Sequence, residues 1–213
     1  MKKSVLQPKW ENTGLSKYRF EQLKDLFAGK KVLDVGCAGG YGRPNWMHEA
    51  ISKTASYTKG IDISQQVIQD ATARGFNVEY GDAQNFNLND TFEVIHAGEL
   101  IEHLDNFHGF LQSSKKHLTP NGILVLTTPN AMRMNNVIYS MLGGLEVNAE
   151  HTCWFCEITL RQLLERNGYK IERMDYIRHQ PKSMVRKFIS AVIRTLVPER
   201  VAWNNILVVA KAA

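Results

Sequence analysis

Three aspartates and one glycine-rich turn have the residue types and spacing to bind a ligand that contains a ribose. Asp34 ends an apolar run and leads into the turn 36–42, where glycines let the backbone pass close to a ligand. Asp62 follows 28 residues later and Asp82 a further 20, each at the end of another apolar run. Of these, we expect Asp62, about 20 residues past the glycine-rich turn, to accept two hydrogen bonds from a ribose diol.

A second polar group follows the fourth apolar run, in the segment Glu99-Leu100-Ile101-Glu102-His103. In a helix, residues three or four positions apart share a face, so the two carboxylates and the imidazole can converge. The same residues also fit a charged helical turn in which Glu99 acts as an N-cap. The spacing alone leaves both interpretations open.

The glycine-rich turn departs from two common phosphate-binding patterns. The dinucleotide fingerprint needs Gly-x-Gly-x-x-Gly, but counted from Gly36 the second and third glycine positions hold Ala38 and Tyr41. The pattern Gly-x-x-x-x-Gly-Lys-Ser/Thr is also absent from the sequence. A nicotinamide-dependent dehydrogenase is therefore disfavoured.

These residues stand at the ends of β-type runs that alternate with helix-like stretches. Strands are expected at 32–35, 57–63, 77–80, 92–97, 122–127, 170–176 and 205–210. Helices are expected at 16–28, 44–52, 64–74, 107–118 and 157–167. The alternation predicts an α/β fold, a Rossmann-like, doubly wound and mostly parallel seven-stranded sheet with helices on both faces. In such a sheet the ligand lies outside the carboxyl ends of the strands, where the aspartates occur.

Size and composition predict a single domain over residues 1–213. Apolar residues make up 44% and charged residues 22% of the chain, which is ordinary for a soluble globular protein. No apolar run resembles a signal peptide or reaches the ~20 residues of a membrane span, so we expect a cytoplasmic protein. Within the domain we expect an N-terminal helical segment at 1–30 and substrate-side insertions at 130–156 and 178–203.

The segment 184–196 is amphipathic and lies in the more basic, C-terminal part of the chain. Its apolar stripe and flanking cations are Val185, Phe188, Ile189, Val192 and Leu196 with Arg186, Lys187 and Arg194. Such a helix can cover a substrate site as a lid, or can lie on an anionic membrane. We favour the lid.

The turn Asp34-x-Gly36-x-Ala38-x-Gly40 resembles the first motif of the class I S-adenosylmethionine-dependent methyltransferases, with alanine at the middle glycine. Alanine adds only a methyl group, which the turn tolerates wherever φ is negative. The resemblance implies S-adenosylmethionine as cofactor, with Asp82 facing the adenine amino group and the Ala83 amide facing a ring nitrogen. The cofactor-binding residues that it implies are Asp34, Gly36, Cys37, Ala38, Gly40, Asp62, Ile63, Asp82, Ala83, Ala97 and Gly98.

The motif Glu-x-x-Glu-His also resembles two methyltransferase subfamilies, the ubiquinone-biosynthesis O-methyltransferases and the small-RNA 2′-O-methyltransferases. In both, these residues and a later histidine hold a divalent metal, and the later histidine maps to His151. The resemblance implies Mg²⁺, Mn²⁺ or Zn²⁺ bound by Glu99, Glu102, His103 and His151. Glu99, His103 and His151 are the implied catalytic residues, since a metal there would lower the pKa of an acceptor hydroxyl.

The sequence therefore predicts transfer of a methyl group from S-adenosylmethionine to a hydroxyl oxygen of a small molecule, a sugar or a lipid-linked intermediate. Two alternatives stay open, an RNA 2′-O-methyltransferase and a pseudoenzyme that binds the cofactor without an acceptor. Nucleic acid is the less expected partner, because the basic stretch lacks interleaved stacking aromatics. The acceptor itself is not specified by these motifs.

Overall fold

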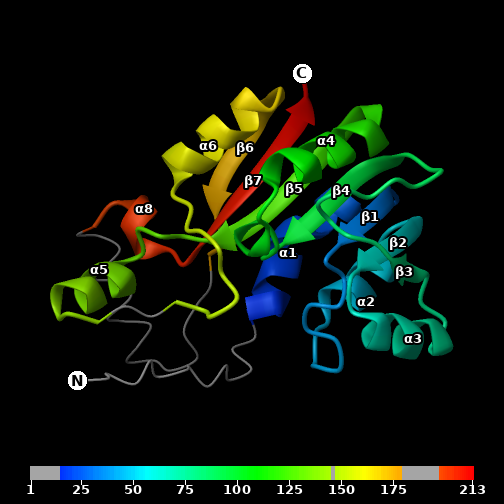
Figure 1. Ribbon diagram of the computed structural model, residues 1–213, viewed down its shortest axis with the longest axis horizontal. Helices are drawn as coiled ribbons and strands as arrows, with labels where there is room; N and C mark the ends of the chain where they lie inside the picture. The colour runs from blue at the N-terminus through cyan, green and yellow to red at the C-terminus, as the bar shows by residue number, and fades with distance from the viewer. Residues whose placement is uncertain (1–14, 145–146, 179–196) are drawn as a thin grey trace.

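The computed structural model describes residues 15–144, 147–178 and 197–213, which form one sheet covered by helices (Figure 1). Its strands are β1 (Lys31–Val35), β2 (Tyr57–Asp62), β3 (Val78–Tyr80), β4 (Phe92–Gly98), β5 (Leu118–Pro129), β6 (Tyr169–Tyr176) and β7 (Asn205–Ala212). They lie in the order β3-β2-β1-β4-β5-β7-β6. Neighbours among β1 to β5 pair in parallel, whereas β7 is antiparallel to both β5 and β6. The predicted seven-stranded, mostly parallel fold is confirmed.

The helices follow the strands in the expected alternation. They are α1 (Leu15–Phe27), α2 (Met47–Ser52), α3 (Gln65–Ala73), α4 (Phe107–His117), α5 (Met134–Met141), α6 (Glu157–Arg166) and α8 (Glu199–Ala202), with a short 3-10 turn, η1 (Ile101–His103). The structure differs from the predicted boundaries most clearly in two places. Strand β5 already begins at Leu118, and α5 forms at Met134–Met141, where no helix was expected.

Helices cover both faces of the sheet because successive residues of a strand point to opposite faces. Leu33 of β1 packs with residues of α4 and α6 in one apolar cluster. Val32 and Val94 pack with residues of α1 and α2 in a second cluster on the other face. The same alternation places Asp34 and His96 on the second face, below the end of the β1–β4 pair.

The carboxyl ends of β1, β2, β3 and β4 meet at one edge of the sheet because these strands are parallel. The turn 36–42 follows β1, Asp62 ends β2, Asp82 follows β3 and Gly98 ends β4. The residues predicted to bind the cofactor are therefore gathered at one edge.

Some expectations concern residues outside the described part of the chain. These are the amphipathic segment 184–196, with its lid or membrane-surface role, and most of the predicted insertion 178–203. Of the predicted insertion 130–156, the structure describes residues 130–144, which include α5, and residues 147–156, which precede α6. In the described ranges, no helix is both long enough and apolar enough to cross a membrane.

Candidate active site

The glycine-rich turn after β1 needs glycine at specific positions. Gly36, Gly40 and Gly42 have φ values of 78°, 82° and 72°, in the left-handed region that side chains disfavour. A Cβ on Gly36 would also lie 3.0 Å from a methyl carbon of Leu100. Ala38 lies outside the left-handed region, so its methyl group is compatible with the turn, as the sequence predicted.

Asp62 holds this turn against the end of β2. Its Oδ2 accepts a hydrogen bond from the Ala38 backbone N–H at 2.9 Å, and its Oδ1 accepts one from the Ser64 N–H at 2.9 Å. The Gly36 N–H donates to the Ile61 carbonyl at 2.9 Å. The acidic residue expected to bind a ribose therefore lies directly beside the turn.

The end of β3 offers a more open surface. Asp82 is exposed, and its Oδ1 accepts a hydrogen bond from the Gln84 N–H at 2.9 Å. Ala83 beside it is buried. Ile63, next to Asp62, leaves 65% of its surface exposed, an unusual fraction for an apolar side chain at a strand end. These residues form a partly apolar surface next to the glycine-rich turn.

Asp34 makes different contacts from those expected of a ligand-binding residue. Its Oδ1 lies 2.7 Å from Nδ1 of His96, and its Oδ2 lies 3.0 Å from Nδ1 of His48. All three side chains are buried. Burial alone would raise the pKa of Asp34, but the hydrogen bonds with His48 and His96 outweigh it and lower the pKa to about 2. Asp34 therefore has a structural role: its buried hydrogen bonds hold together the end of β1 from which the turn begins.

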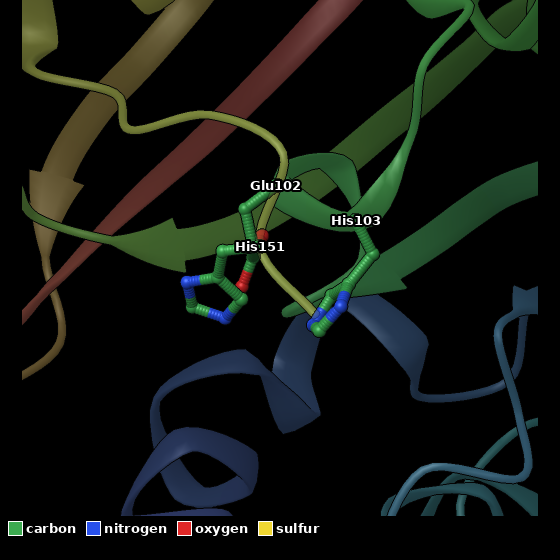
Figure 2. Close-up of side chains that lie close together, drawn as sticks. All are labelled: Glu102, His103 and His151. Carbon is green, nitrogen blue, oxygen red and sulfur yellow. The ribbon is translucent and has the colours of Figure 1, made fainter. Parts of the chain in front are cut away.

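Three of the four predicted metal-binding residues lie close together (Figure 2). Glu102 and His103 belong to η1, immediately after β4, and His151 lies on the segment that precedes α6. One potential ligand atom from each of the three lies within 4.8 Å of the others. The imidazole rings of His103 and His151 are edge to face, with centroids 4.7 Å apart. Residues almost fifty positions apart in the sequence thus form one cluster.

Backbone contacts hold the segment 150–152 against η1. The Thr152 N–H donates to the Glu102 carbonyl at 2.9 Å, and the Thr152 hydroxyl donates to the Leu104 carbonyl at 2.8 Å. Nδ1 of His103 lies 3.2 Å from the Glu150 carbonyl oxygen. These bonds place His151 beside η1, where its ring meets that of His103.

The cluster contains polar atoms that are buried and lack partners among the described residues. Glu102 is 1% exposed, and its Oε2 accepts a hydrogen bond from the Thr128 hydroxyl at 2.8 Å. Its Oε1 and the Nδ1 of His151 have no such partner. Burial and the nearby charge of Glu99 raise the pKa of Glu102 to about 8. Burial and the neighbouring His103 lower the pKa of His151.

Glu99 is the fourth predicted ligand, and it is not one of the three residues whose potential ligand atoms lie together. Its φ is 55°, so it adopts a left-handed conformation before η1 begins. Its Oε2 accepts a hydrogen bond from Nδ2 of Asn205 at 2.6 Å, and its Oε1 lies 4.0 Å from Nη1 of Arg19. The predicted convergence assumed a helix that includes residue 99, whereas η1 covers only Ile101–His103.

Sequence reasoning missed four residues at this edge of the sheet, namely Arg19, His48, His96 and Asn205. The link between Asp34 and His96 follows from strand pairing, because the two residues are partners in the β1–β4 register. That register is not visible in the sequence. Asn205 reaches Glu99 because β7 pairs with β5 in the sheet. No motif in the sequence marks Asn205.

Comparisons with known proteins agree with this architecture. Residues 11–173 match the protein family described as "Methyltransferase domain". The ubiquinone biosynthesis O-methyltransferase of Haemophilus ducreyi is 33% identical over 114 residues, which cover 48% of this chain and 46% of that protein. The mitochondrial ubiquinone biosynthesis O-methyltransferase of Schizosaccharomyces pombe is 31% identical over 115 residues, 49% of this chain and 40% of that protein. The chain thus spans about half the length of these curated relatives.

Solved structures show the same fold. An S-adenosylmethionine-dependent methyltransferase from Archaeoglobus fulgidus superposes with a TM-score of 0.71 at 21% identity, covering 94% of both chains. Magnesium protoporphyrin IX methyltransferase from Synechocystis, solved with bound S-adenosylhomocysteine, gives a TM-score of 0.61 at 15% identity and covers 93% of this chain and 81% of that one. With a family match over residues 11–173, most of its length, this chain belongs to the methyltransferase-domain family.

Proposed function

We propose that this enzyme transfers the methyl group to a hydroxyl oxygen that binds beside the cluster of Glu102, His103 and His151. The observation that carries the proposal is the position of the cluster, which lies on and beside η1, close after Gly98 at the end of β4. A hydroxyl held there would lie next to the edge where the cofactor residues gather. The relatives named as ubiquinone biosynthesis O-methyltransferases support an oxygen acceptor.

The three side chains fit a divalent cation. A carboxylate and two imidazoles are suitable ligands for Mn²⁺ or Zn²⁺, and with water also for Mg²⁺. Oε1 of Glu102 and Nδ1 of His151 are buried and have no partner in the described part of the chain, so both can take a cation without breaking a bond. When bound, the cation would make an acceptor hydroxyl more acidic.

The protein's own residues contribute position and the exclusion of water. The Thr128 hydroxyl fixes the orientation of the Glu102 carboxylate, and Thr152 keeps the His151 segment beside η1. Burial lowers the pKa of His151, so its ring is neutral at neutral pH and offers a lone pair. Methyl transfer is an in-line displacement at the sulfonium carbon, and alignment of the two reactants supplies up to ~7–11 kcal/mol in such reactions.

The test follows a labelled methyl group from S-adenosylmethionine into a panel of phenols, sugars, lipid-linked phenols and short RNAs. We expect label on oxygen in a phenol, sugar or lipid-linked acceptor, loss of turnover after exhaustive chelation, and recovery with Mn²⁺, Zn²⁺ or Mg²⁺. His151→Ala should remove turnover while cofactor binding persists. His108→Ala is the matched control. His108 is an exposed histidine of α4 outside the cluster, and its Nδ1 lies 2.7 Å from Oδ1 of Asn167.

Each part of the proposal has its own contrary result. Label on nitrogen or carbon would overturn the oxygen acceptor. Full turnover after chelation would overturn the cation. Label on an RNA ribose alone would favour the RNA 2′-O-methyltransferase, and binding of the cofactor without transfer to any acceptor would favour the pseudoenzyme.

A further inference from the structure

Gln84 joins two segments that are far apart in the sequence. Its side-chain oxygen, Oε1, accepts hydrogen bonds from the backbone N–H groups of Asp105 and Asn106, at 3.0 Å and 2.6 Å. An amide oxygen has two lone pairs, so both are used on one short stretch of backbone. A single side chain that follows β3 therefore holds the segment that leads from η1 into α4.

The contact between Gln84 and α4 leaves no spare room. The backbone oxygen of Gln84 is only 2.3 Å from the point where a Cβ on Gly109 would stand. Asn106 caps the same helix, because its Oδ1 accepts a hydrogen bond from the Gly109 N–H at 2.9 Å. Glycine at position 109 thus lets the first turn of α4 pack directly on residue 84. Since closely packed groups transmit displacements, a movement of residue 84 must also move this turn.

On its own side of this contact, Gln84 belongs to the cofactor edge. Its N–H donates to Oδ1 of Asp82 at 2.9 Å, and Ala83 between them is buried. Asp82 and Ala83 are the residues that we expect to face the adenine. The expected adenosine contact and the Gln84 side chain are therefore neighbours in one short turn.

On the other side, the contact reaches the cluster. His103 and Glu102, both in η1, stand two and three residues before Asp105 (Figure 2). Thr152 holds the same stretch through the carbonyl oxygens of Glu102 and Leu104, at 2.9 Å and 2.8 Å. The segment 102–106 thus has two anchors, one beside the cofactor edge and one beside His151.

We propose that Gln84 is a positioning residue through which a bound cofactor orders the segment 102–106. A ligand that binds beside Asp82 and Ala83 favours the ordered form of the turn 82–84. The two hydrogen bonds from Asp105 and Asn106 to Gln84 then favour the ordered form of η1 and of the start of α4. The proposal requires only a bound cofactor, so it stands or falls separately from the oxygen acceptor and the cation.

Hydrogen exchange, measured with and without saturating 5′-methylthioadenosine, tests this coupling. The probe contains the adenosine of the cofactor and lacks its amino-acid end, and calorimetry confirms that each variant binds it. In the wild type we expect the probe to slow exchange roughly 3- to 10-fold at residues 82–85 and also at 105–111.

Gln84→Met keeps the length of the side chain and removes the acceptor. We expect the probe still to slow exchange at residues 82–85 but to change it less than about 1.5-fold at 105–111. Gln84→Glu should restore the effect at 105–111, because a carboxylate accepts the same two hydrogen bonds. Gln66→Met is the matched control at an exposed position of α3 and should behave as the wild type.

A purely structural role of Gln84 predicts a different pattern. Gln84→Met would then speed exchange at residues 105–111 by the same factor with and without the probe, and this result would overturn the proposal. The absence of any probe effect at 105–111 in the wild type would overturn it as well, and that measurement needs no variant. Neither result depends on which acceptor is methylated.

Discussion

The carboxylate of Asp34 and the imidazole of His96 meet across the β1–β4 strand pair, where Oδ1 and Nδ1 are 2.7 Å apart. The two residues are register partners in that parallel pair. His48 of α2 approaches the other oxygen of the same carboxylate at 3.0 Å. One buried carboxylate therefore connects two strands and a helix directly below the glycine-rich turn.

Replacing this carboxylate should destabilise the protein. In Asp34→Asn, one imidazole faces an amide N–H instead of an acceptor, and the charge is lost from two buried hydrogen bonds. We expect a loss of ~3–5 kcal/mol in the free energy of unfolding, measured by urea denaturation. Asp25→Asn, at an exposed position of α1, is the control and should stay within ~0.5 kcal/mol of the wild type. Equal stability of the two variants would contradict the role of Asp34.

The same carboxylate should give a specific acid dependence. Its pKa is lowered in the folded protein from an ordinary value of 3.8 to about 2, because the bonds with His48 and His96 outweigh burial. Protons therefore bind the unfolded chain first as the pH falls. The stabilisation from Asp34 should be complete above pH ~4 and should disappear between pH ~4 and ~2, a change on the order of 2 kcal/mol. Urea titrations of wild type and Asp34→Asn across this interval measure it, and a constant difference between them would refute it.

Gly36 and Ala38 should respond oppositely to a change of one methyl group. Gly36→Ala places a Cβ at a positive φ and 3.0 Å from Leu100, so we expect ~1–3 kcal/mol of destabilisation and weaker cofactor binding. Ala38→Gly removes a methyl group that the turn tolerates and should leave binding within about twofold. Titration with S-adenosylhomocysteine and thermal unfolding compare the two. Normal binding by Gly36→Ala would show that the turn is not the cofactor site.

Asp62 should matter for the cofactor through two contacts. Asp62→Ala removes an acceptor for the Ala38 N–H and the proposed acceptor for the ribose. We expect S-adenosylhomocysteine to bind roughly 10- to 100-fold more weakly, a loss of ~1.5–3 kcal/mol. Asp70→Ala, on the exposed side of α3, serves as the control. A 2′-deoxyribose analogue should lose affinity with the wild type but little further with Asp62→Ala, and independent losses from the two changes would disprove the ribose contact.

Features that depend on neighbouring residues in the sequence were predictable. The acid and glycines around Asp34 and Gly36 lie within a few residues of each other, so the turn was visible as a motif. Asp62 was predicted because it stands at the end of an apolar run that is recognisable as a β-strand. The pairing of Asp34 with His96 was not predictable, because it depends on which strand lies beside β1.

Two local features were missed for other reasons. The prediction for Glu99 assumed a continuous helix, and a positive φ at a non-glycine residue is rare enough that no pattern announces it. Helix α5 was missed although Met134, Val137, Ile138 and Met141 recur at helical spacing, because the segment is only eight residues long. Ile138 and Met141 are 46% and 82% exposed, so this apolar stripe is not buried among the described residues.

Strand β7 has a consequence for how the protein is made. It comes after β5 and β6 in the chain, yet it lies between them in the sheet and supplies Asn205 to Glu99. On a ribosome, β5 and β6 are therefore synthesised first, and no strand joins them in the sheet until β7 emerges. A nascent chain that stops before Asn205 lacks both the sheet that joins them and the residue that holds Glu99. The seven-stranded sheet is therefore completed only after translation has passed this strand.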